Sequence, residues 1–157
     1  MTDHRAVAVH LNNAVWNRLA AEDITEEGDP SDRQELLYAA YASTYHWIQV
    51  GTPANRARGE HLISRVASRV GEVDIAFRHA LRCLDLVESH PEVMEDWDLA
   101  FALEALARAQ AGLGDVATAR STLERALQAS SEITADDDRA VLEEELHREP
   151  WFGLERP

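Results

Sequence analysis

The sequence predicts an all-α fold in which antiparallel helical hairpins stack on one another. Apolar residues recur every three to four positions along most of the chain, and no convincing alternating pattern of a β-strand is found. Two stretches also resemble each other at a separation of 43 residues, which is typical of a repeated structural unit. The length of 157 residues fits one domain, residues 1–157, with a single sizeable core.

The first half of the chain contains the predicted boundaries of four helices. Ser31 and Gln34 have the spacing of a capping box, which places the start of the second helix at Ser31. Thr52 is a favourable N-cap, and Pro53 suits the first position of the third helix. The acidic segment 22–30 is expected to be a mobile linker. The expected helices cover residues 5–21, 31–50, 53–70 and 73–89.

Three more helices are predicted in the second half of the chain. Glu95, Asp96 and Asp98 place negative charge at the start of the fifth helix, where the helix dipole favours it. Trp151 and Phe152 in the C-terminal tail are expected to pack back on the body. The expected helices cover residues 95–113, 115–130 and 135–148, and the tail covers residues 150–157.

The second helix carries no charged residue between Leu36 and Val50. A helix that is apolar nearly all round is typically buried among neighbours, so we expect this one to be sandwiched inside the stack. Two roles are open for His46 within it. It can be a core histidine that donates to a backbone carbonyl, or it can face the polar groove described below.

The two similar stretches are VGEVDIAFRHALRCL at residues 70–84 and LGDVATARSTLERAL at residues 113–127. In each, an apolar residue, Gly, an acidic residue and Val come first, and Ala follows five residues after the Gly. This pattern resembles the tetratricopeptide repeat (TPR) family across residues 55–131. The resemblance implies three antiparallel hairpins in a short right-handed solenoid, capped by the seventh helix. The separation exceeds the family's repeat of about 34 residues, and we expect the surplus in the loop 90–97.

The resemblance also implies a concave face lined by the first helix of each hairpin. On these helices, polar residues spaced three and four apart share one face. His61 and Glu104 occupy equivalent positions, as do Asn55 and Asp98, so the members of each pair can meet or grip a ligand. The expected ligand-binding residues of this polar groove are His10, Asn13, Asn17, His46, Asn55, Arg58, His61, Arg65, Asp98, Phe101, Glu104 and Arg108.

Simpler structural roles remain open for the same residues. Arg58 and Arg65 can pair with neighbouring carboxylates on a solvated face. Asp98 can stabilise the start of its helix through the helix dipole, and Asn55 can serve in local capping. The tryptophans that can pack in the core or in the groove wall are Trp16, Trp47 and Trp97.

Composition limits the partners. The net charge of −14 argues against nucleic acid, whose phosphates require clustered cations, and against an anionic membrane surface. No apolar run reaches the length of a membrane span, and the first residues lack the features of a signal peptide, so we expect a cytoplasmic protein. Cys83 is the only cysteine, which excludes an internal disulfide and a cysteine-based zinc site. All fifteen basic residues are arginine, a bias typical of a GC-rich bacterial genome.

We favour a binding module among the functions that fit this groove. Arg58, Arg65 and Arg108 can hold the carboxylate of a small acidic molecule, a peptide or a partner protein, because a guanidinium pairs with a carboxylate through two hydrogen bonds. A purely structural role is the simplest alternative, with the groove filled by the chain's own tail or by a second copy in a homodimer.

A small helical enzyme or metalloprotein is the other alternative, so catalysis is left open. His46 or His61 could act as acid or base together with Glu104. The residues that could hold zinc or iron are His10, His46, Glu60, His61 and Glu104. Glu60 and His61 point about 100° apart on a helix, and no compact metal motif is present. We therefore predict no cofactor.

Overall fold

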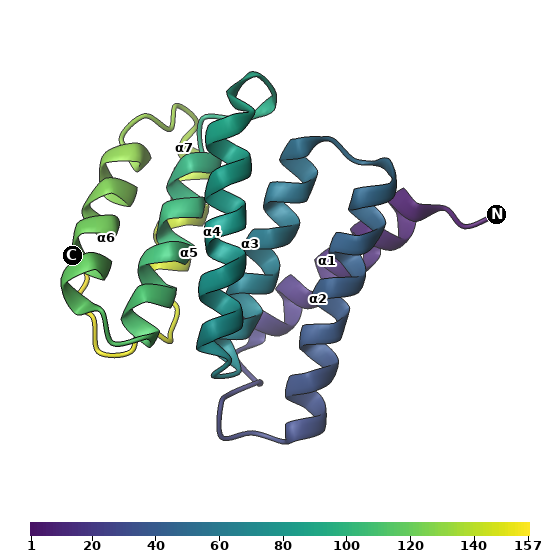
Figure 1. The fold of residues 1–157 in the computed structure, drawn as a ribbon, viewed down its shortest axis with the longest axis horizontal. Helices are drawn as coiled ribbons and strands as arrows, with labels where there is room; N and C mark the ends of the chain where they lie inside the picture. Colours follow the sequence, from purple (N-terminus) through teal and green to yellow (C-terminus); the bar gives the residue numbers. More distant parts are fainter.

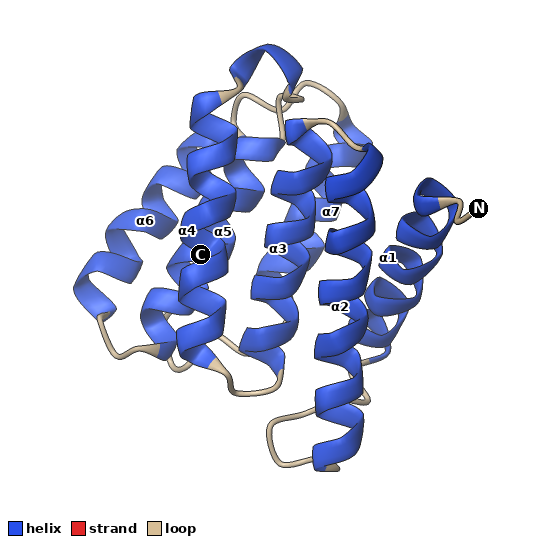
Figure 2. Cartoon of the chain, turned by 45° about the vertical axis from the view of Figure 1, so that its right-hand side comes forward, coloured by secondary structure: helices blue, strands red, loops and turns tan.

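The predicted all-α class is confirmed by the computed structural model, which describes all 157 residues and contains no strand (Figures 1 and 2). Seven α-helices account for most of the chain, and their bounds lie within a few residues of the expected ones. They are α1 (His4–Ala21), α2 (Pro30–Val50), α3 (Pro53–Arg69), α4 (Val73–Ser89), α5 (Asp98–Gly112), α6 (Val116–Ser130) and α7 (Asp136–His147). None of them combines the length and apolarity that crossing a membrane requires.

Helices that follow one another in the sequence pack side by side. The pairs α1–α2, α3–α4 and α5–α6 each form contacts along their length, and α2–α3 and α4–α5 join the pairs (Figure 1). Helix α3 also contacts both α1 and α5, and α7 contacts α5. The first helices of the three pairs therefore lie next to one another, and α7 lies behind α5 in the view of Figure 1.

The two similar stretches form the same turn. Gly71 and Gly114 have φ angles of 83° and 85°, a conformation that glycine adopts more readily than other residues. In both turns the amide of the residue after the glycine donates to a carbonyl five residues earlier, at the end of the preceding helix. Glu72 donates to the Ala67 carbonyl, and Asp115 donates to the Gln110 carbonyl. The internal repeat is therefore a repeat of backbone geometry as well as of sequence.

Capping at two helix starts was predicted with different success. Thr52 caps α3, with Pro53 in its first turn, and forms a reciprocal capping box with Asn55. Ser31 is not the cap of α2, because that helix begins earlier and its cap is Asp29, whose carboxylate accepts from the Ser31 amide. The Asp-Pro pair at 29–30 places proline in the first turn, which is a stronger start signal than the serine.

The fifth helix begins later than the acidic cluster indicated. Glu95 and Asp96 lie in the loop before α5, and Asp98 is its first residue. The loop also contains the short 3-10 helix at Pro91–Val93, which takes up part of the surplus length. Asp96 accepts hydrogen bonds from the amide and hydroxyl of Thr134, which lowers the pKa of Asp96. The loop is thereby tied to the segment that leads into α7.

The acidic linker is attached to α3 in its first part. Ile24 is buried in the core cluster formed with α1, α2 and α3. The Arg69 guanidinium donates to the carbonyls of Ile24 and Glu22, at 2.7 and 3.1 Å. These contacts hold the chain against the end of α3 before it continues to α2.

The expectation that α2 is buried on nearly all sides is wrong. It packs against α1 and α3, but one face remains open. Tyr38 is 63% exposed, Tyr45 56% and Ile48 50%. Tyrosine and isoleucine carry no charge, so the composition of the helix did not distinguish an open tyrosine face from a buried one.

Candidate functional site

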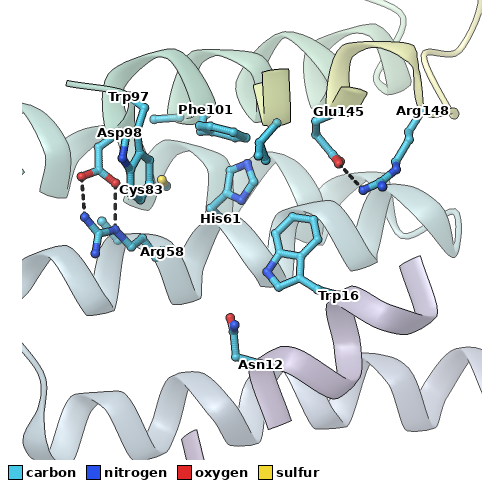
Figure 3. A pocket seen from close by; sticks show the side chains of 13 residues that line it. Asn12, Trp16, Arg58, His61, Cys83, Trp97, Asp98, Phe101, Glu145 and Arg148 are labelled. Atoms are coloured by element: carbon cyan, nitrogen blue, oxygen red, sulfur yellow. Dashed lines mark hydrogen bonds and ion pairs between the residues drawn. The ribbon is translucent and has the colours of Figure 1, made fainter. Parts of the chain in front are cut away.

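A cavity of about 350 Å³ lies between α1, α3, α5 and α7 (Figure 3). This volume falls within the range of small-molecule sites in proteins. Trp16 and Asn12 come from α1, and Val141 comes from α7. The first helices of the three pairs thus form the walls that the repeat pattern indicated, and α7 closes one side.

Aromatic rings form much of the wall. His61 lies between Trp16 and Phe101: its ring stacks on Trp16 at 5.8 Å between centroids and meets Phe101 edge-on at 5.6 Å. Phe101 in turn meets Trp97 edge-on at 5.8 Å. His61 is 6% exposed, so most of its ring is in contact with these neighbours.

Arg58 and Asp98 form the best-defined ion pair at the cavity. The Nε and Nη2 atoms of Arg58 donate to the two carboxylate oxygens of Asp98 at 3.0 and 2.8 Å, and the guanidinium lies 4.4 Å from the centre of the Trp97 ring. Asp98 is also held by the Glu95 amide. The Nη1 group of Arg58 makes no hydrogen bond, and its side chain is 35% exposed.

A network of buried charges lies behind the cavity wall. Glu104 accepts from Nε and Nη2 of Arg108, with the Nε bond at 2.8 Å. The Nε atom of Arg65 donates to Glu145 of α7 at 2.5 Å and lies 3.8 Å from Glu104. His61 connects the network to the cavity, because its Nε2 atom lies 3.4 Å from the Glu104 carboxylate.

The network keeps its carboxylates ionised in spite of burial. Burial alone would raise the pKa of Glu104, but Arg108, His61 and Arg65 outweigh it and lower the value to about 2. Burial opposes ionisation of Glu145 in the same way, and Arg65 more than offsets it, so its pKa is also lowered. For Arg108, burial and Arg65 lower the pKa to about 10 although Glu104 and Glu145 act against them. Glu104, Glu145 and Arg108 are therefore charged at neutral pH.

Arg108 also fixes the C-terminal segment. Its guanidinium donates to the backbone carbonyls of Glu145, Arg148 and Pro150 at 3.0, 2.7 and 2.8 Å. It lies 4.1 Å from the centre of the Trp151 ring, which is 1% exposed. One arginine of α5 thereby orders the end of α7 and the residues after it.

Four of the expected groove residues line the cavity together: Arg58, His61, Asp98 and Phe101. The face of the first helix that was expected to line the groove is wrong. His10, Asn13 and Asn17 are exposed and lie outside the cavity, and their neighbours Asn12 and Trp16 line it instead. A shift of one residue rotates a helical position by about 100°, and the sequence of α1 contains polar residues at both phases.

Three other groove residues are not accessible. The expectation of an exposed inner stripe is wrong for Arg65, Glu104 and Arg108, which are 1%, 0% and 0% exposed. Their positions on the concave face are as expected, but α7 and the tail cover them. The sequence predicted a cap at the end of the stack, and it did not indicate that the seventh helix lies across this face.

His46 and Asn55 have local partners away from the cavity. The Nδ1 atom of His46 lies 2.8 Å from Nδ1 of His4, so its ring faces the start of α1. Asn55 takes part in the capping box at Thr52, which was the simpler role expected for it. Trp47 lies under Arg5, at 5.5 Å from the ring centre, whereas Trp16 and Trp97 belong to the cavity wall.

The residues considered for zinc or iron are not brought together. Glu60 pairs with His79 of α4, and His61 with Glu104. His10 is exposed on α1, and His46 pairs with His4. No group of three or more histidine, cysteine, aspartate or glutamate side chains has the arrangement of a metal site.

Sequence reasoning missed the contribution of α7 to the cavity. Glu145 and Arg148 line it, and Arg148 Nη1 donates to Glu145 at 3.0 Å. Cys83 of α4 also reaches the cavity wall. Burial and the nearby Asp98 raise the pKa of the Cys83 thiol far above its usual range, so it remains a neutral thiol and not a nucleophile. Residues 143–149 are a run of mostly charged residues, which is typical of an exposed helix face and did not indicate a cavity wall.

The cavity can bind a flat group and recognise one polar end. Its aromatic walls exclude water from an apolar ring, and two nitrogen groups on one face of α3 have no hydrogen-bond partner, Nη1 of Arg58 and Nδ1 of His61. No protein-family model matches the sequence, and no curated protein or solved structure is significantly similar to it. The function is therefore argued from this site alone.

Proposed function

We propose that the protein is a binding module whose cavity holds a small carboxylic acid, or the carboxylate end of a peptide, through a flat apolar group. One observation carries this proposal: three aromatic rings and two unpaired nitrogen groups share one cavity of about 350 Å³. The apolar group lies between Trp16, Trp97 and Phe101. Its carboxylate accepts a hydrogen bond from Nη1 of Arg58. Because Nε2 of His61 faces the Glu104 carboxylate, Nδ1 donates a second hydrogen bond only from the imidazolium form.

The spacing on α3 supports a carboxylate at this position. Arg58 and His61 are three residues apart on one helix, so their Cβ atoms are separated by roughly 5–6 Å. Arg58 can therefore meet one oxygen of a carboxylate, and Nδ1 of His61 can meet the other when the imidazole carries both protons. Arg58 is already neutralised by Asp98, but a paired guanidinium retains its outer N–H groups for a second acceptor. This favours a ligand with one carboxylate over a highly charged anion.

The first experiment compares two probes that differ only at the polar end. Isothermal titration calorimetry at neutral pH is carried out with 2-naphthoate and with 2-naphthalenemethanol, which have the same ring system. We expect 2-naphthoate to bind at least about tenfold more tightly, a difference of about 1.4 kcal/mol. Equal binding of the two probes, or no binding of either, contradicts the proposal.

A blocking variant locates the binding. Val141 lies at the cavity and is 56% exposed, so Val141→Trp can fill the opening without displacing a buried side chain. Val116 on α6 is 43% exposed and does not line the cavity, and Val116→Trp is the matched control. We expect Val141→Trp to abolish binding and Val116→Trp to preserve it, with unchanged melting temperatures. Binding that survives in Val141→Trp places the probe elsewhere and overturns the assignment to this cavity.

A second pair of variants tests whether the Arg58 guanidinium binds the carboxylate of the ligand. Arg58→Lys keeps a positive charge beside Asp98 but removes the planar guanidinium that can serve two carboxylates at once. Arg56 is exposed on the same helix, and Arg56→Lys is the control. We expect Arg58→Lys to weaken binding of 2-naphthoate about tenfold, and to leave 2-naphthalenemethanol unchanged. A similar loss for both probes would show that the arginine supports the wall and not the carboxylate.

A further inference from the structure

A chain of three side chains connects α3, α4 and α2 on the side of α3 away from the cavity. Glu60 accepts from Nδ1 of His79, and Nε2 of His79 lies 2.8 Å from the hydroxyl of Tyr41. His79 is 4% exposed, and the Glu60 side chain is 15% exposed. Tyr41 is 36% exposed, so the chain begins inside the protein and ends at the surface.

The order of the groups fixes the direction of proton transfer. An ionised Glu60 accepts a hydrogen bond only, so the Nδ1 proton is on His79. In the neutral imidazole the lone pair is then on Nε2, which faces the Tyr41 hydroxyl. A hydroxyl within hydrogen-bond reach of a base, with that base oriented by a carboxylate, is the arrangement of an activated nucleophile.

The two other tyrosines provide an internal comparison. All three tyrosines of the chain lie on α2, at 38, 41 and 45, and share its open face. Tyr38 and Tyr45 are 63% and 56% exposed, more than Tyr41. Neither hydroxyl contacts a base: Tyr38 accepts from Gln34 at 3.2 Å, and Tyr45 makes no hydrogen bond. A reaction governed by exposure favours these two, whereas a reaction governed by base assistance favours Tyr41.

Two arginines of α4 act on the same hydroxyl. Arg78 and Arg82 are exposed, lie on either side of His79 in the sequence, and interact electrostatically with Tyr41. Burial raises the pKa of Tyr41, and Arg78 and Arg82 only partly offset this, so the phenol stays protonated at neutral pH. Its proton must therefore be removed during attack. The two guanidinium groups attract an anionic donor, and the planar guanidinium matches the geometry of a phosphate group.

We propose that Tyr41 is a nucleophile that accepts a phosphoryl group, with His79 as its general base and Glu60 as the residue that positions His79. The donor is an acyl phosphate. The Tyr41 oxygen forms a bond to phosphorus as the bond between phosphorus and the carboxylate oxygen breaks. His79 takes the phenol proton and releases it to solvent, and the carboxylate leaves as an anion. The phosphate of the product is stabilised by Arg78 and Arg82.

The test uses the full chain and acetyl phosphate. Peptide mass spectrometry measures the initial rate of phosphorylation at each tyrosine. We expect Tyr41 to react at least about tenfold faster than Tyr38 and Tyr45, because general-base assistance typically contributes a factor of about 10²–10⁴. Equal rates at the three tyrosines, or faster reaction at Tyr38 or Tyr45, overturn the proposal. This comparison requires no substitution, so a variant that does not fold cannot obscure it.

Variants then separate base assistance from charge. A neutral alkyl phosphonofluoridate reacts with the same oxygen and loses fluoride, but Arg78 and Arg82 do not attract it. His79→Gln is expected to lower the rate of Tyr41 modification at least about tenfold with both reagents. Glu60→Gln is expected to lower the two rates by a smaller factor. Arg78→Gln combined with Arg82→Gln should slow the reaction of Tyr41 with acetyl phosphate and leave its reaction with the neutral reagent unchanged. If His79→Gln melts at the wild-type temperature and Tyr41 reacts as fast as before, the chain of Glu60, His79 and Tyr41 has only a structural role.

Discussion

The Nε2 atom of His61 lies 3.4 Å from the carboxylate of Glu104, and these residues occupy equivalent positions in two hairpins whose sequences are 43 residues apart. His61 faces the cavity on its other side, whereas Glu104 is 0% exposed. The pair therefore joins the candidate binding site to the buried charges that hold α7. A ligand that contacts His61 therefore acts on a residue that is also connected to the buried charges at the C-terminal segment.

The buried carboxylates predict a loss of stability in acid. The pKa of Glu104 in the folded protein is about 2, below its ordinary value of 4.5, and that of Glu145 is also lowered. As pH falls, the unfolded chain binds these protons first. The stabilisation is therefore complete above about pH 4.5 and is lost as pH falls toward about 2. Urea unfolding at a series of pH values should show this slope.

The matched variants for this prediction are Glu104→Gln and Glu124→Gln. Glu124 is exposed on α6 and has no ion-pair partner. We expect Glu104→Gln to lower the free energy of unfolding at pH 7 by about 3–5 kcal/mol, because it leaves the buried Arg108 without its ion-pair partner. The acid slope should also become smaller. Glu124→Gln should change neither by more than about 0.5 kcal/mol. An unchanged acid slope in Glu104→Gln would assign the transition to other groups.

Removal of the Arg108 guanidinium should release the C-terminal segment first. Arg108→Met removes the side-chain donor from three backbone carbonyls, two of which then have no donor, and also leaves Glu104 without its closest partner. We expect hydrogen exchange to increase in residues 142–154 before it increases in α3 or α4. Arg125 forms only an exposed pair with Glu88 at 3.8 Å, so Arg125→Met is the control. A uniform increase across all helices in Arg108→Met would show that the arginine supports the whole stack and not this segment.

The contact between α2 and α3 requires a glycine at position 59. A Cβ atom there would lie 2.7 Å from Oγ1 and 2.8 Å from Cγ2 of Thr44. Gly59→Ala should therefore destabilise the protein by about 1–3 kcal/mol, the usual effect of overpacking. In the Thr44→Ala background the two closest atoms are absent and only Cβ, at 3.1 Å, remains near, so the same change should be close to neutral because the better helix propensity of alanine offsets the residual contact. A double-mutant cycle in urea measures the difference, and an equal effect in both backgrounds would contradict it.

Cys83 should be unreactive in the folded protein. Its thiol is 3% exposed, and burial together with Asp98 raises its pKa well above the usual range. At pH 8 we expect 5,5′-dithiobis(2-nitrobenzoate) to react slowly with the native protein and rapidly with the chain in denaturant. Since Cys83 reaches the cavity wall, 2-naphthoate should slow the native reaction further. Rapid modification of native protein would indicate that this wall opens frequently.

Local sequence signals predicted most helix boundaries and one contact across the stack. Thr52 and Pro53 mark the start of α3, and Gly71 and Gly114 mark equivalent turns, because capping and left-handed turns depend on the chemistry of a few adjacent residues. The pairing of His61 with Glu104 followed from the repeat, since equivalent positions in neighbouring hairpins lie side by side. Errors at Ser31 and at the start of α5 arose where two local signals competed.

The residues of the candidate site could be predicted only in part. Arg58, His61, Asp98 and Phe101 share the cavity as expected, because one helix face follows from spacing alone. The phase of α1 was not predictable in this way, since polar residues occur all round that helix and a rotation of 100° exchanges Asn13 for Asn12. Exposure of α2 was not predictable either, because tyrosine suits both a buried and an open face.

By itself, the sequence determined the helices, most of their ends and the polar face of α3, because these depend on contacts within one or two turns. Tertiary structure decided which of those polar residues remain accessible. Helix α7 and the tail cover one face of α3 and α5 and bury Arg65, Glu104 and Arg108, while Arg58 and His61 still face the cavity. The same packing brings Glu60, His79 and Tyr41 into one chain from three helices. Such contacts form between residues far apart in the chain, and only the packing of helices on one another places them.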